Sequence, residues 1–382
     1  MNTPHSPPSP YSPWWLPTAI IILLSVCVLL FALLVLKTSH TESTEIQNSN
    51  AENVAQFEWK LVTSWPKNYP GLGLAPEYFA KLVNEMSNGR LVVHVYGARE
   101  IVGPLEVFDA VSSGSVEMGH SGAYYWKGKI PAAVFFTSVP FGMNAQEFNA
   151  WLHHGGGLEL WREAYAPFNL IPFAGGNTGV QMGGWFNKEI NSVEDLKGLK
   201  MRIPGLGGEV FSRAGGTAQN IAGGELYTSL QTGVIDATEW VGPYNDLAFG
   251  FHQIAKYYYY PGWHEPGPGM EFTVNKQKYE SLPADLQKII EVAARAVNQE
   301  MLDEYTANNS RALNELVNKH KVELRPFPDD VLAELRKYAE EIYQEQAKDD
   351  EFFSTVYHSY TDFLASTRSY MKISEEAYFE LR

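Results

Sequence analysis

Residues 180–205 read VQMGGWFNKEINSVEDLKGLKMRIPG, and residues 226–240 read LYTSLQTGVIDATEW. The first stretch predicts two strands, Val180 to Asn187 and Lys200 to Pro204, separated by a short helix or turn at SVEDLKG. The second predicts a helix that stops at a glycine, followed by a strand from Ile235 to Trp240. Because strands and helices alternate, we expect this part of the chain to form an α/β lobe of its own.

The same alternation precedes this lobe. WKLVTS at 59–64 and LVVHVY at 91–96 are predicted strands, and residues 74–86 between them have helical periodicity and are followed by Asn88-Gly89, a helix stop signal. This order of elements is typical of a parallel sheet. The strand predicted at 271–275 is expected to return to the first lobe, which would make that lobe discontinuous and create hinge crossings.

The C-terminal third is predicted to be helical. A long helix is expected from Pro283 to about Asn318, and another begins near Pro328. A final helix carries an apolar stripe from Phe352 to Leu364, which packs either on its own domain or on a partner subunit. The predicted units are a first lobe at about 57–178 plus 268–320, a second lobe at about 179–267 and C-terminal helices at about 321–382.

Composition limits the classes of function. The chain has 382 residues, which suggests two domains, and a net charge of -15, which argues against nucleic-acid binding. Its one cysteine, Cys27, excludes an internal disulfide and a cysteine-based zinc site in the folded part. There is no phosphate-binding loop and no H-E-x-x-H motif.

The N-terminus contains an uncharged apolar run, IIILLSVCVLLFALLVL, at residues 20–36. Its length is near the lower limit for a membrane-spanning helix, and the leader before it lacks the Lys or Arg of a usual signal peptide. We therefore predict a membrane anchor at 1–39, with a cleaved signal peptide as the alternative. The polar residues 40–56 are predicted to be a flexible linker.

One motif approximates a catalytic site. Gly119-His120-Ser121-Gly122-Ala123 is close to the G-x-S-x-G nucleophile elbow, but the residues after Ser121 are a poor helix. A serine esterase using Ser121 is therefore kept as an alternative function.

Polar residues in aromatic or glycine-rich surroundings offer a second kind of site. Arg202 ends a predicted strand, where its guanidinium is placed to grip a carboxylate. Glu239 ends another strand and would repel an anionic ligand unless a cation intervened. Oxygen ligands from Glu239, Glu265 and a glutamine amide would suit Na⁺ or Ca²⁺ better than zinc.

Several segments in this order resemble a known family, the solute receptors of tripartite ATP-independent periplasmic (TRAP) transporters of the DctP type. They are WKLVTSWP at 59–66, VPFGM at 139–143, GGWFNKEINSVEDLKGLKMRIPG at 183–205 and LQTGVIDATEWVGPYND at 230–246. The resemblance is greatest to members that bind 2-oxo or 2-hydroxy monocarboxylates, such as pyruvate or lactate, together with a metal ion.

The resemblance implies roles for particular residues. Arg202 corresponds to the carboxylate clamp, and Gln181 to a glutamine that contacts both ligand and cation. Glu239, the backbone carbonyl of Trp240, and Glu265 correspond to further ligands of a Na⁺ or Ca²⁺ ion that bridges the ligand.

The resemblance also implies less specific features. Tyr125, with its neighbour Tyr124, is expected to line the cleft, and Asn245 is a further candidate ligand contact. The implied fold is a two-lobed periplasmic-binding-protein type, type II-like, with a long helix between the lobes and a C-terminal helical extension. Homodimers through the C-terminal helix are implied, as is a membrane permease as partner.

The sequence therefore predicts a periplasmic receptor that performs no covalent chemistry and delivers a small carboxylate to a permease. The predicted anchor would tether it to the inner membrane. Besides the esterase, a membrane-tethered adaptor or sensor without a transport role is the remaining alternative.

Overall fold

The computed structural model describes residues 22, 24–33 and 56–382. Residues 22 and 24–33 are helical, and the rest of the predicted anchor and nearly all of the predicted linker lie outside the described residues. Within the described residues, none of the helices has both the length and the apolar character needed to cross a bilayer. Residues 56–382 form one compact unit.

The first sheet of this unit has five strands in the order β2-β1-β3-β10-β4. Strand β1 pairs in parallel with β2 and β3, whereas β10 is antiparallel to both β3 and β4. The sheet is therefore mixed rather than parallel, because β10 enters it from the opposite direction. Its strands are β1 (Phe57–Thr63), β2 (Leu91–Tyr96), β3 (Met118–Ser121), β4 (Leu170–Asn177) and β10 (Gly269–Asn275).

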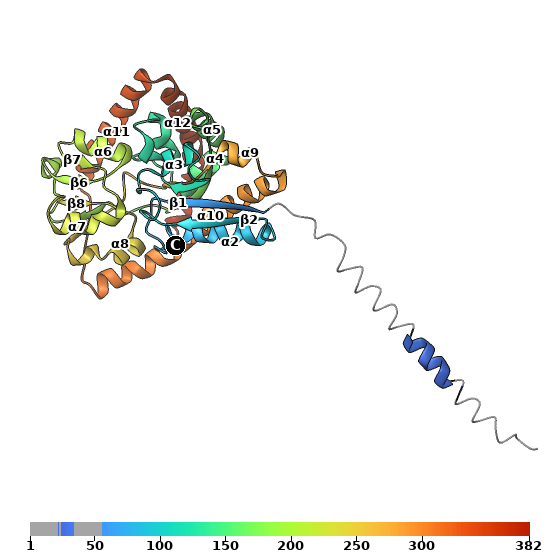
Figure 1. Ribbon diagram of the computed structural model, residues 1–382. Coiled ribbons are helices and arrows are strands. Elements are labelled where there is room, and N and C mark those ends of the chain that lie inside the picture. The colour runs from blue at the N-terminus through green and yellow to red at the C-terminus, as the bar shows by residue number, and fades with distance from the viewer. Residues whose placement is uncertain (1–21, 23, 34–55) are drawn as a thin grey trace, which may run out of the picture. The chain divides into compact units, whose positions relative to one another are not determined.

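The second sheet has six strands in the order β11-β9-β5-β8-β6-β7. Here β6 is parallel to β7 and β8, and β5 is antiparallel to β8 and β9. Figure 1 shows β6, β7 and β8 grouped with α6 and α7, apart from β1, β2 and α2. The strands are β5 (Gly184–Phe186), β6 (Lys200–Arg202), β7 (Thr217–Gln219), β8 (Ala237–Thr238), β9 (Tyr257–Tyr260) and β11 (Glu323–Pro326).

Helices cover both sheets and connect them. The long helix α10 packs against α2 and β4 of the first lobe and against α8 of the second. The α-helices are α2 (Leu74–Met86), α3 (Val107–Ser112), α4 (Ala145–His154), α5 (Gly157–Tyr165), α6 (Gly205–Arg213), α7 (Leu226–Gln231), α8 (Pro243–Phe249), α9 (Lys276–Glu280), α10 (Ala284–Asn318), α11 (Asp329–Asp349), α12 (Glu351–Met371) and α13 (Glu375–Phe379). Short 3₁₀ helices are η1 (Ala123–Trp126), η2 (Pro131–Phe136), η3 (Ala166–Phe168), η4 (Val193–Leu196), η5 (Gly223–Glu225) and η6 (Phe251–Gln253).

The C-terminal aromatic stripe packs on its own chain. Phe353, Val356 and Tyr360 of α12 are buried, and the rings of Phe353 and Tyr360 lie 4.9 and 5.3 Å from that of Phe135 in η2. Burying such rings contributes about 2 kcal/mol each by removing apolar surface from water. The exposed apolar side chains of this region lie further on, at Tyr370, Ile373, Tyr378, Phe379 and Leu381.

These findings confirm the two-sheet α/β fold with a long helix and C-terminal helices. The helix α2 matches its predicted range, 74–86, and β10 joins the first sheet as expected. The predicted strand at 180–187 is too long, because β5 contains only Gly184–Phe186. The lobe boundaries given above stay predictions.

Candidate ligand and cation site

The pairing of two short strands brings Arg202 and Glu239 together. Strands β6 and β8 are parallel neighbours, with Arg202 opposite Thr238 in the register. Glu239 follows Thr238 directly, and its backbone N–H donates to the Arg202 carbonyl at 3.3 Å. Because parallel strands end at the same edge of a sheet, both functional side chains emerge at one place.

Arg202 is buried and already has partners. Its guanidinium forms an ion pair with Glu239, donates to the Ile221 carbonyl at 3.1 Å and donates to the Tyr125 hydroxyl at 3.2 Å. It also lies 5.1 Å from the centroid of the Trp240 ring. Burial opposes the charge, but Glu239 together with Tyr125, Tyr124 and Glu265 outweighs it, and the pKa of Arg202 is raised. The arginine therefore stays charged.

Two main-chain hydrogen bonds hold Gln181 against the turn that carries Glu265. The Gln181 N–H donates to the Glu265 carbonyl at 3.2 Å, and the Gly262 N–H donates to the Gln181 carbonyl at 2.8 Å. A Cβ atom at Gly262 would lie 2.4 Å from the Gln181 carbonyl oxygen. Only glycine therefore fits at position 262 without moving the backbone.

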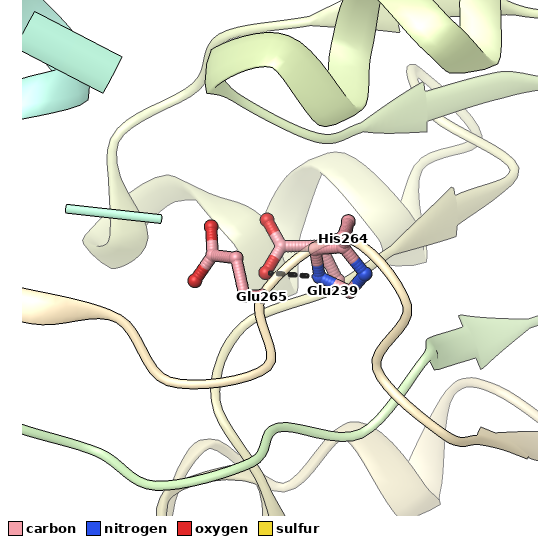
Figure 2. A group of neighbouring side chains, drawn as sticks. All are labelled: Glu239, His264 and Glu265. Atoms are coloured by element: carbon pink, nitrogen blue, oxygen red, sulfur yellow. Dashed lines mark ion pairs between the residues drawn. The ribbon is translucent and has the colours of Figure 1, made fainter. Parts of the chain in front are cut away.

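Oxygen atoms from three segments come together here, and none of them has a hydrogen-bond partner among the described residues. They are Gln181 Oε1, Glu239 Oε2 and Glu265 Oε2, all buried. One ligand atom each of Glu239, His264 and Glu265 lies within 4.8 Å of the others, and Figure 2 shows these side chains gathered together. Buried unpaired oxygens cost free energy, so this set fits a hard cation such as Na⁺ or Ca²⁺.

The electrostatics of the cluster agree with a cation site. Burial raises the pKa of Glu265 well above its ordinary value, and the nearby Glu239 carboxylate raises it further. Two buried carboxylates this close repel each other unless a positive charge lies between or beside them.

His264 is a member of the cluster to which the sequence analysis assigned no role. Its Nε2 lies 3.4 Å from Glu239 Oε2, and neither ring nitrogen has a hydrogen-bond partner within the described chain. The sequence contained one indication of a role for His264, which is its position directly before Glu265 in the segment WHEP at 263–266.

Aromatic side chains enclose the site. The Tyr125 ring lies 4.6 Å from the Tyr124 ring, and the Trp65 ring lies 6.1 Å from the Trp240 ring. Next to them is a cleft of about 750 Å³ between η1 and α6, lined by Tyr124 and Tyr125 on one side. Tyr125 and Trp240 contact the buried Arg202, so they shield its guanidinium from water.

Asn245 lies in α8 and connects three elements. Its Nδ2 donates to the Pro70 carbonyl at 2.9 Å, and its Oδ1 accepts from the Tyr305 hydroxyl of α10 at 2.7 Å. Its backbone carbonyl accepts from the Tyr69 hydroxyl at 2.8 Å. The structure therefore gives Asn245 contacts between the two lobes, and its predicted contact with a ligand stays a prediction.

Ser121 lacks the surroundings of a nucleophile. It is fully buried, its hydroxyl pairs with that of Ser64 at 2.7 Å, and a 3₁₀ helix rather than an α-helix follows. The neighbouring His120 is occupied: Nδ1 accepts from Trp65 at 2.8 Å, and Nε2 donates to the Gly175 carbonyl at 3.0 Å. The geometry therefore gives the esterase alternative no general base at Ser121 among the described residues.

The fold and the site define a two-lobed solute-binding protein, in which a buried arginine of the second sheet contacts Tyr125 of η1 and lies beside buried carboxylate oxygens. Residues 61–350 match the model of the bacterial extracellular solute-binding proteins, family 7, or DctP. The chain belongs to this family. This agrees with the prediction that it is a transport receptor and not an enzyme.

Three proteins illustrate the similarity. A monocarboxylate 2-oxoacid-binding periplasmic protein of Nostoc sp. is 44% identical, covering 89% of this chain and 93% of its own length. A TRAP periplasmic solute-binding protein of Pseudoalteromonas atlantica, solved with sodium and pyruvate, is 46% identical, with a TM-score of 0.83 over 85% of this chain and 99% of that one. A counterpart from Colwellia psychrerythraea, solved with calcium and pyruvate, is 46% identical, with a TM-score of 0.84 over 86% and 100%.

Proposed function

We propose that this chain binds a small 2-oxo or 2-hydroxy monocarboxylate of the pyruvate or lactate type, together with Na⁺ or Ca²⁺, and delivers it to a TRAP permease. The observation that carries the proposal is the buried Arg202 beside buried, unpartnered oxygens of Gln181, Glu239 and Glu265. The similar proteins named above support pyruvate as the first ligand to test.

Arg202 would bind the ligand carboxylate through two parallel N–H···O bonds. In the structure Arg202 pairs with Glu239, so the carboxylates of Glu239 and of the ligand would compete for one guanidinium. A bound cation supplies positive charge to Glu239 and polarises the ligand oxygens. Gln181, Glu239, Glu265 and the Trp240 carbonyl would hold it, which would leave Arg202 free to turn to the ligand. Tyr125 and the surrounding rings would exclude water and strengthen these interactions.

The test is calorimetric titration of the chain with pyruvate after removal of divalent ions with a chelator. Choline chloride replaces sodium chloride in the reference buffer. We expect weak or no binding in choline, and recovery when either Na⁺ or Ca²⁺ is added. Equal affinity for pyruvate in all three buffers would exclude the cation-bridged site.

We further propose that the receptor forms dimers through its C-terminal end. Because the stripe on α12 is buried on its own chain, the surface left for a second copy contains Tyr370, Ile373, Tyr378 and Phe379, all exposed. Light scattering should give a dimer mass that falls to the monomer mass in Ile373→Ser/Phe379→Ser. An unchanged mass would rule out this surface.

We also propose that the apolar segment at residues 20–36 remains attached and tethers the receptor to the outer face of the inner membrane. Fractionation should then place the chain with the membranes, and N-terminal sequencing should find that segment intact. Recovery of a shortened, freely soluble chain would favour a cleaved signal peptide.

A further inference from the structure

A second cavity lies on the first lobe, away from the ligand and cation site. Its volume is about 260 Å³, and its walls come from the end of α4, from α5, from β4 and from one face of α10. None of the residues assigned above to carboxylate or cation binding lines it.

The walls of this cavity carry an excess of positive charge. Its lining includes Arg162, Lys288 and Arg295, whereas Glu291 is its acidic residue. Lys288 forms an ion pair with Glu291, which also accepts from the Tyr279 hydroxyl at 3.2 Å. Arg162 and Arg295 have no ion pair or side-chain hydrogen bond with any described residue. The protein has a net charge of -15, but the charge at this cavity is locally positive because two arginines there lack an ion-pair partner among the described residues.

His153, at the end of α4, adds an unused polar atom. Its Nε2 is buried and has no hydrogen-bond partner among the described residues. Burial lowers the pKa of His153, and the charges of Arg295 and Arg162 lower it further. The imidazole is therefore neutral at pH 7, and both arginines lie close enough to affect it.

The remaining walls are apolar. The guanidinium carbon of Arg162 lies 5.8 Å from the centroid of the Phe173 ring, and Leu158 lies one turn before Arg162 in α5. On α10, Val292 lines the cavity with half of its surface exposed. Residues 288, 291, 292 and 295 are spaced to share one helix face. The cavity thus combines cationic groups with apolar walls, of which Val292 is exposed, Leu158 is partly buried and Phe173 is buried.

We propose that this cavity binds an organic anion with an apolar body, held by Arg162 and Arg295 at its charged group and by Leu158 and Val292 at its apolar part. Two guanidinium groups suit a carboxylate, which accepts parallel N–H···O bonds. The apolar contacts distinguish the ligand from an inorganic anion, because only a ligand with an apolar body gains free energy by covering the apolar walls.

The experiment titrates the full-length chain with benzoate, after the first site has been saturated with pyruvate and Ca²⁺. Benzyl alcohol supplies the ring without the charge, and sulfate supplies charge without the ring. The test variant is Arg162→Gln/Arg295→Gln. The control is Arg311→Gln, which removes an exposed arginine of α10 that donates to Asn308 Oδ1 at 3.4 Å.

We expect saturable benzoate binding that is at least about tenfold tighter than binding of benzyl alcohol or sulfate. It should weaken at least about tenfold in the double variant and stay unchanged in the control, and pyruvate affinity should be the same in all three proteins. Absence of saturable benzoate binding, equal binding by the double variant, or binding of sulfate as tight as that of benzoate would each overturn the proposal.

Discussion

Replacing Arg202 with methionine tests the proposed carboxylate clamp. Methionine keeps an unbranched side chain of similar length but removes every donor. Hydrogen bonds to charged groups contribute about 1.5–3 kcal/mol each, so loss of a two-bond clamp should cost at least about 3 kcal/mol. Pyruvate affinity should therefore fall by at least ~100-fold.

The same substitution should also lower stability. Glu239 is fully buried and would lose its ion-pair partner. An unpaired buried charge costs about 3–5 kcal/mol, so the free energy of unfolding should fall by about 3 kcal/mol. In Arg202→Met/Glu239→Gln most of that stability should return, because the buried charge is removed, while pyruvate binding should stay absent.

Calorimetry of pyruvate binding and urea denaturation provide the two measurements. Arg213→Met is the matched control, since Arg213 pairs with Glu345 at the surface. It should leave pyruvate affinity unchanged. A pyruvate dissociation constant in Arg202→Met within about threefold of the native value would refute the clamp, because that difference is below 1 kcal/mol.

Four further substitutions test the surroundings of the site. Burial raises the pKa of Glu271 to about 7 from an ordinary 4.5, so the folded state binds this proton more tightly than the unfolded state. The stability that protonated Glu271 contributes is therefore lost as the pH rises from ~4.5 to ~7. This group should make the free energy of unfolding, measured with urea, about 3 kcal/mol lower at pH 8 than at pH 5, and Glu271→Gln should remove that difference. Asn245→Ala should weaken pyruvate binding about tenfold by loosening the contact between lobes, at a cost of about 1–2 kcal/mol in stability; an unchanged affinity would limit it to a folding role. Gly262→Ala should weaken Ca²⁺ binding at least ~10-fold, whereas Gly128→Ala, in open space, should not. Glu265→Gln should reduce the advantage of Ca²⁺ over Na⁺ in supporting pyruvate binding by at least ~10-fold, and an unchanged ratio would remove Glu265 from the cation ligands.

The sequence predicted elements whose signals are local. The helix at 74–86 has an apolar face and is followed by Asn88-Gly89, both of which act within a few residues. The strand β4 (Leu170–Asn177) was not predicted, because its Pro172, Gly175 and Gly176 are turn residues in local statistics. In the fold Pro172 and Gly176 pair with β10, which arrives about 100 residues later, and Gly175 lies at a bulge between the paired residues. Such pairing has no local signature.

What the sequence could predict about the site was limited for the same reason, because contacts between distant segments have no local signal. Arg202 and Glu239 were predicted because each ends an apolar strand, and strand ends meet at a sheet edge. The predicted strand at 180–187 failed at its start, where Gln181 and Met182 donate to Glu265 and Val241 rather than to a sheet neighbour. The first bond places Gln181 beside Glu265, about 80 residues away in sequence, and the second joins segments about 60 residues apart.

The charges explain how an acidic protein binds an anion at this place. With Arg202, Glu239 and Glu265 ionised, the site has one negative charge, and a bound monocarboxylate brings a second. A monovalent cation would leave one negative charge buried and a divalent cation would leave none, so the divalent ion should bind more tightly when the carboxylates are ionised. Under the proposed function, the carboxylates of Glu239 and of the ligand would compete for the Arg202 guanidinium. A cation bound to Glu239 would relieve this competition, so binding of the anion should depend on the cation. The buried carboxylates of an acidic protein would in this way control the binding of an anionic ligand.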